Sequence, residues 1–186
     1  MKSLVRRSIE AAALALAVLQ ITLIRASTRR GDEVIVLDID NTLADAWPSF
    51  LRPFDSHRAR LANLEVLPNI KEAVHDPAVG DGATIVYLSH RNLWEWPVTY
   101  RWLRTHGFVV RADRLLLVPS AAAEVPLVRR MAEGRTVTMW DDLSFGHETG
   151  EVRFYDDVID SLGGVSLTYR GWADIVGLTG RGLERD

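Results

Sequence analysis

The sequence predicts an α/β fold, a three-layer Rossmann-like sandwich with a central parallel sheet, preceded by an N-terminal hydrophobic helix. Two observations carry this prediction. Short apolar runs, typical of buried parallel strands, alternate along the chain with longer stretches that are typical of helices. A helix between two strands forms a right-handed crossover, so successive units place helices on both faces of one parallel sheet. A chain of 186 residues suits one such domain.

The segment from Glu10 to Arg25 is predicted to be a helix that is apolar from Ala11 to Ile24, interrupted only by Gln20 and Thr22, and that has no polar face. A helix of this kind is buried either in protein or in lipid. The run is short for a full membrane span, which needs roughly 20 residues, and Ala26 offers a position for signal cleavage. Docking on the domain, association with a membrane and secretion all remain open. We assign residues 1–30 to this helix and its basic connector, a possible membrane anchor, and residues 31–186 to the domain.

Four buried strands are predicted from continuous apolar runs, at 34–37, 84–88, 115–118 and 137–140. Helices are predicted around them at 48–64, 69–76, 94–106 and 121–133, with Gly107 and Gly134 just past the ends of the last two. Beyond Ser144 we expect a turn at 147–150, short strands at 151–155 and 165–169, and a final helix at 172–178. The connection between the first two strands, roughly 40 residues, leaves little room for a separate domain that covers the substrate.

Composition excludes several classes of function. The formal net charge is -3 and the arginines are scattered, so the chain lacks the basic surface that binds nucleic acid. Cysteine is absent, which removes disulfides, thiolate catalysis and cysteine-ligated zinc. Lys2 and Lys71 are the only lysines. This scarcity matters wherever a catalytic lysine is sought, because almost all of the positive charge is arginine.

Polar side chains follow three of the predicted strands. The first strand ends in Asp38 and Asp40, the second in Ser89, and the strand at 137–140 in Asp141 and Asp142. Ligands of an open parallel sheet collect at the carboxyl ends of its strands, so we expect these side chains to meet. Carboxylates gathered at one edge repel each other without a counter-ion, and a hard divalent cation such as Mg2+ suits them.

These strand ends resemble motifs of the haloacid dehalogenase (HAD) superfamily. The run from Asp38 to Thr42 is similar to its first motif, an apolar strand followed by Asp-x-Asp-x-Thr, and Ser89 and the pair Asp141-Asp142 are similar to its second and fourth motifs. Ser89-His90-Arg91, with the helix that follows, resembles the acid-phosphatase-like branch. The short first insert resembles that of capless members.

The resemblance implies a Mg2+-dependent phosphomonoester hydrolase that acts through an aspartyl-phosphate on Asp38. Asp40 would carry the proton to the leaving oxygen and then activate water. Ser89 would donate a hydrogen bond to a phosphoryl oxygen, and Thr42 would brace the loop after the first strand. The implied metal ligands are Asp38, the backbone carbonyl of Asp40, and Asp141, with Asp142 as a further ligand or a support.

The lysine of the family's third motif, near the start of the helix before the fourth motif, has no counterpart in this sequence. Arg129 and Arg130 could replace it, because arginine binds phosphate in bidentate fashion, but both lie late in the predicted helix and could equally be solvated. Arg91 is another candidate for the phosphate-binding cation.

Two other functions stay open at this point. The missing lysine is consistent with a catalytically weak, membrane-tethered binding or scaffold protein, and transfer of the phosphoryl group to an acceptor other than water has the same signature as hydrolysis. The expected partner is a phosphorylated small molecule or an exposed phosphate on a larger one. We expect a cytoplasmic or membrane-associated chain, with secretion left open.

Overall fold

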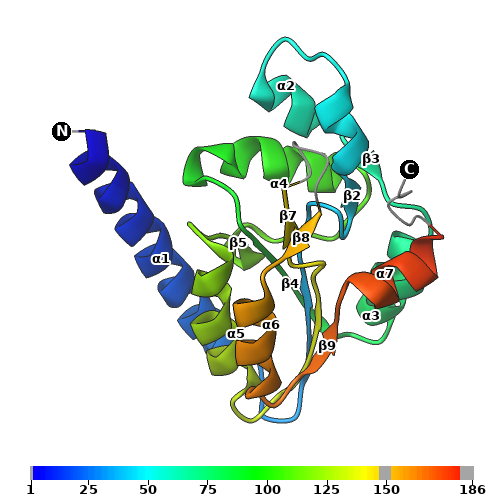
Figure 1. Ribbon diagram of the computed structural model, residues 1–186. Helices are drawn as coiled ribbons and strands as arrows, with labels where there is room; N and C mark the ends of the chain where they lie inside the picture. Colours follow the sequence, from blue (N-terminus) through cyan, green and yellow to red (C-terminus); the bar gives the residue numbers. More distant parts are fainter. Residues whose placement is uncertain (1, 147–151, 181–186) are drawn as a thin grey trace.

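A central sheet of five parallel strands lies between two layers of helices in the computed structural model, which describes residues 2–146 and 152–180 (Figure 1). The strand order is β5-β4-β1-β6-β9, so β1 pairs with both β4 and β6. This arrangement confirms the predicted fold class. The strands are β1 Glu33–Leu37, β4 Thr84–Ser89, β5 Leu115–Leu117, β6 Thr136–Trp140 and β9 Thr168–Arg170.

The helices divide between the two faces of the sheet. One face is covered by α1 Lys2–Ser27, α5 Glu124–Ala132 and α6 Asp156–Gly163. The other is covered by α2 His57–Ala62, α3 Asp76–Gly80, α4 Trp96–Thr105 and α7 Trp172–Thr179.

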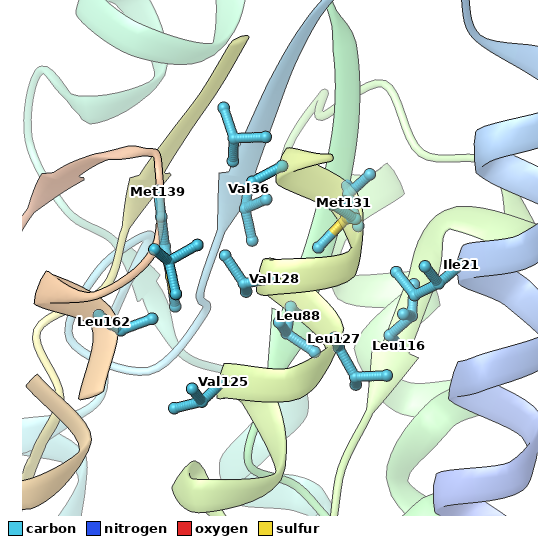
Figure 2. Packing of buried hydrophobic residues seen from close by; sticks show 14 of the residues in the cluster. Ile21, Val36, Leu88, Leu116, Val125, Leu127, Val128, Met131, Met139 and Leu162 are labelled. Carbon is cyan, nitrogen blue, oxygen red and sulfur yellow. The ribbon is translucent and has the colours of Figure 1, made fainter. Parts of the chain in front are cut away.

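Each face of the sheet has its own hydrophobic core, because successive side chains of a strand point in opposite directions. Val36 of β1 lies in the core on the α5 side, whereas the next residue, Leu37, lies in the core on the α4 side. In the first core, Val36 and Met139 of the sheet lie opposite Val128 of α5 (Figure 2). Continuous apolar strands are therefore required here, since both sides of each strand are buried.

The insert between β1 and β4 differs from its prediction. Instead of one helix at 48–64, a 3-10 helix at Trp47–Leu51 is followed by a break and then by α2. The break contains Pro53, and Ser56 caps α2 by accepting a hydrogen bond from the backbone N–H of Ala59 at 3.1 Å. Two short antiparallel strands, β2 Ala44–Asp45 and β3 Glu65–Val66, close the insert at its base. The insert stands beyond the carboxyl end of the sheet (Figure 1).

The C-terminal part differs as well. The strand predicted at 151–155 is shorter and belongs to a separate antiparallel pair, β7 Ser144–Phe145 with β8 Arg153–Phe154. The turn predicted at 147–150 lies outside the described residues. The sequence analysis also overlooked α6, whose Val158 and Leu162 are spaced four residues apart and reach the core.

Helix α1 docks on the domain along one face. Ala17, Ile21 and Ile24 lie in the core on the α5 side. Buried Gln20 donates a hydrogen bond from Nε2 to the backbone carbonyl of Leu115 at 3.2 Å. This part of α1 is packed as an ordinary element of the domain, which favours the docked-helix alternative for its inner face.

The outer face of α1 is apolar and exposed. Leu16, Leu19 and Leu23 lie on it, with Leu19 55% exposed. Among the described residues, α1 is the one helix long and apolar enough to cross a membrane by length and composition, and its N-terminal half extends away from the other elements (Figure 1).

The C-terminal end of α1 is held by an arginine from far along the chain. The guanidinium of Arg135 donates hydrogen bonds to the backbone carbonyls of Arg25 at 2.7 Å and Thr28 at 3.2 Å, and to Oγ1 of Thr28 at 2.7 Å. A cation at this end also complements the partial negative charge of the helix terminus.

Replacing Ile21 by alanine tests whether α1 belongs to the core. We expect Ile21→Ala to lower the free energy of unfolding by about 2–5 kcal/mol, because it leaves a cavity in a packed interior. The control Leu19→Ala, on the exposed face of the same helix, should change it by less than about 0.5 kcal/mol. Urea denaturation of both variants measures the difference, and equal effects would contradict the docking.

Candidate active site

The carboxyl ends of β1, β4 and β6 bring the predicted acidic residues together. Asp38 follows β1, and its backbone N–H donates to the carbonyl of Trp140 at 2.9 Å, which extends the ladder to the fourth motif. Carboxylate oxygens of Asp38, Asp141 and Asp142 lie within 4.8 Å of one another, and all three residues are buried. Buried Ser89, the last residue of β4, lies close enough to Asp38 for its hydroxyl to lower the pKa of that carboxyl.

The loops after the strands are fixed by hydrogen bonds between the motifs. Oγ1 of fully buried Thr42 accepts from the backbone N–H of Asp142 at 3.2 Å, which ties the first motif to the fourth. Oδ1 of Asp141 accepts from the backbone N–H of Leu143 at 2.8 Å, and the hydroxyl of Ser144 donates to Oδ2 of Asp142. These contacts orient the two carboxylates before any ligand binds.

Burial and mutual repulsion raise the pKa of each clustered carboxyl. Burial first, and then the charge of Asp40, raise the pKa of Asp38 from 3.8 to about 7. The pKa values of Asp141 and Asp142 are raised well above the ordinary range, again by burial first and then by neighbouring carboxylates. Oxygen donors this close, whose ionised forms are disfavoured without a cation, fit a hard divalent ion such as Mg2+.

Asp40 and Arg91 form a bidentate ion pair at the edge of the cluster. Nε and Nη2 of Arg91 donate to the two carboxylate oxygens of Asp40, each at 2.7 Å, and Nη1 donates to Oγ1 of Thr99 at 2.9 Å. Burial would raise the pKa of Asp40, but the Arg91 guanidinium outweighs it and holds this pKa below the ordinary value. Arg91 therefore contacts Asp40 directly, and its guanidinium donors are directed at Asp40 and Thr99.

A cavity of about 420 Å3 opens over the cluster. The insert contributes Phe50 and half-buried Arg60 to its lining, and β7 contributes Phe145. Nη1 of Arg60 donates to Oγ of Ser49 at 2.9 Å, and its guanidinium stacks over the ring of Phe50. Sequence reasoning did not single out Arg60, because no motif surrounds it and many arginines are scattered over the chain. The signal that could have found it is its place in the insert that follows the first motif.

Glu124 is a second residue that sequence reasoning missed. It is the first residue of α5, is 1% exposed and lines the same cavity. Its pKa is raised well above the ordinary value by burial first and then by Asp38. Its Oε2 is buried and has no hydrogen-bond partner among the residues that the structure describes.

The structure does not bring Arg129 and Arg130 to the cavity. Both lie in the last turn of α5, are exposed, and are absent from the cavity lining. The acidic pair Asp156-Asp157, which could be mistaken for the fourth motif, begins α6 and is exposed.

Comparisons with known proteins support the fold. No protein-family model matches the chain, and no curated protein matches it in sequence. The chain resembles the crystal structure of the class C acid phosphatase from Bacillus anthracis with tungstate bound, at 16% identity and a TM-score of 0.50, over 96% of this chain and 86% of that one. A second structure of the same phosphatase matches at 16% identity and a TM-score of 0.48, over 96% of this chain and 84% of that one. The chain therefore has the α/β fold of this class C acid phosphatase.

Proposed function

We propose that the chain is a Mg2+-dependent phosphomonoesterase that acts through an aspartyl-phosphate on Asp38. The observation that carries this proposal is the convergence of three buried carboxylates, Asp38, Asp141 and Asp142, with the hydroxyl of Ser89 in one open cavity. The likeness in fold to a phosphatase with tungstate, a tetrahedral oxyanion like phosphate, supports it.

Asp38 is the nucleophile of the proposed reaction. Its carboxylate oxygen forms a bond to phosphorus while the bond from phosphorus to the ester oxygen breaks; attack of water on phosphorus then releases phosphate and restores the carboxylate. Asp38, the backbone carbonyl of Asp40 and Asp141, with Asp142 as a further ligand or support, would hold the Mg2+. When bound, the ion would supply positive charge that offsets the charge of the phosphoryl group and favours the ionised form of Asp38. Ser89 donates a hydrogen bond to a phosphoryl oxygen.

Asp40 moves the proton in both steps of the proposed reaction. Because its pKa is lowered by Arg91, Asp40 is ionised at neutral pH, which suits the second step, where it accepts a proton from the attacking water. Donation to the leaving oxygen in the first step requires the protonated form and is favoured at acidic pH. We therefore assign Arg91 the role of positioning Asp40.

The cavity lining indicates the kind of ester that fits. Phe50 and Phe145 supply aromatic surface beside the acidic cluster, while half-buried Arg60 supplies a positive charge. This combination suits a phosphomonoester whose leaving group has a flat apolar part, with Arg60 contacting the phosphate.

Asp38→Asn should abolish the reaction. We expect release of phosphate from an aryl phosphate to fall by at least about a thousandfold, because removal of a nucleophile eliminates the covalent route. A chelator should abolish the activity of the wild type, and Mg2+ should restore it. The exposed Asp160→Asn is the matched control and should keep full activity. Equal rates for wild type and Asp38→Asn would refute the mechanism and favour a catalytically weak binding protein.

Arg60→Ala should weaken substrate binding. Loss of a charge-assisted hydrogen bond costs about 1.5–3 kcal/mol, which corresponds to a rise in KM of about tenfold or more. Arg60→Lys keeps the charge and should recover part of the loss. The paired change of Arg129 and Arg130 to alanine should leave kcat/KM unaltered. A larger effect from that pair than from Arg60 would return the phosphate-binding role to the end of α5.

We also propose that the exposed face of α1 rests on a membrane surface while its inner face stays docked on the domain. The support is the apolar outer row Leu16, Leu19 and Leu23 on a helix flanked by arginines.

Changing Leu16, Leu19 and Leu23 together to glutamine tests this contact without unfolding the domain. We expect the wild type to sediment with anionic lipid vesicles and the triple variant to stay in solution, because the apolar area that enters the lipid is lost. Deleting residues 1–26 is a poorer test, since it also removes core residues such as Ile21. Equal sedimentation of both proteins would exclude the contact.

A further inference from the structure

Glu124 is the buried carboxyl group that the proposed chemistry leaves unused. It begins α5, is 1% exposed and lines the cavity over the acidic cluster. Its Oε2 accepts no hydrogen bond from the part of the chain that the structure describes. A buried carboxylate oxygen without a donor is costly, so a ligand that supplies positive charge at this point would stabilise it.

The charges around the cavity do not balance with one divalent ion. Asp38, Glu124, Asp141 and Asp142 line it with four carboxylates, the charge of Asp40 is offset by Arg91, and Arg60 adds one positive charge. With all of these groups ionised, their formal charges sum to -3. One divalent cation changes the sum to -1, and a second changes it to +1. A phosphate dianion is attracted most strongly in the last case.

The position of Glu124 suits a separate ion better than a fourth ligand to the first. Carboxylate oxygens of Asp38, Asp141 and Asp142 lie within 4.8 Å of one another, and Glu124 does not belong to this group. The carboxyl of Glu124 nevertheless contacts that of Asp141. Two-metal sites that act on phosphate esters commonly hold their ions close together through a shared carboxylate.

We propose that Glu124 and Asp141 hold a second divalent cation, which supplies the positive charge that a lysine at the start of this helix supplies in the superfamily that the sequence resembles. The chemical role of the second ion rests on the proposed function, whereas its binding does not. The competing explanation for the contact between the two carboxyls is a shared proton, which needs no second ion.

The test is the stoichiometry of Mn2+ binding to the full chain, because Mn2+ takes oxygen ligands as Mg2+ does and its free form is measured by electron paramagnetic resonance. We expect two tightly bound Mn2+ per chain for the wild type and one for Glu124→Gln, which keeps the size of the side chain. Glu72→Gln, an exposed glutamate in the 71–75 helix, is the matched control and should bind two. Thermal unfolding of each variant verifies that it is folded.

Glu124→Lys provides the second variant. It should bind one Mn2+ and lose less phosphatase activity than Glu124→Gln, because the ammonium group supplies part of the positive charge of the second ion. One Mn2+ in the wild type, or two in folded Glu124→Gln, would overturn the inference and favour the shared proton. A wild type that binds two Mn2+ but releases no phosphate would overturn the proposed function and support the second site.

Discussion

The rest of the structure depends on the repulsion between carboxylates that the parallel sheet brings to one buried edge. Because β1 lies between β4 and β6, the sheet holds the residues that follow these three strands next to one another. Asp38, Asp141 and Asp142 are buried at this edge, where their ionised forms are disfavoured. The fold therefore holds the carboxyl groups so close together that their ionised forms are stabilised only by added positive charge.

Positive charge and hydrogen bonds are distributed unevenly around this edge. On the side of the insert, Arg91 neutralises Asp40 and Arg60 lines the cavity. On the side of α5, where Glu124 and Asp141 meet, the cavity lining holds acidic and neutral groups. Backbone N–H groups and hydroxyls orient the fourth-motif carboxylates but add no full charge. In the proposed reaction, this asymmetry would place proton transfer on the side of the insert and metal binding on the side of α5.

The fold and the centre of the site could be predicted because both depend on local sequence. Continuous apolar strands predict a parallel sheet. The side chains that directly follow these strands, such as Asp38 and Ser89, are then expected to meet at its edge. Arg60 and Glu124 could not be predicted in this way. Arg60 lies in a short helix that begins only after a break at Pro53, and the phase of α5 decides which of its side chains face inward. The strand predicted at 151–155 is present but shorter, at Arg153–Phe154, where it pairs with the two residues of β7.

The anchoring of α1 by Arg135 has a consequence for synthesis of the chain. The contact joins residues 110 positions apart, and the helix that α1 packs against, α5, is also made late. During translation α1 is made before the elements that it packs against, so both of its apolar faces stay uncovered until α5 has been made. An interval of this length exposes the helix to aggregation. A lipid surface or a chaperone that held α1 during this interval would protect the nascent chain.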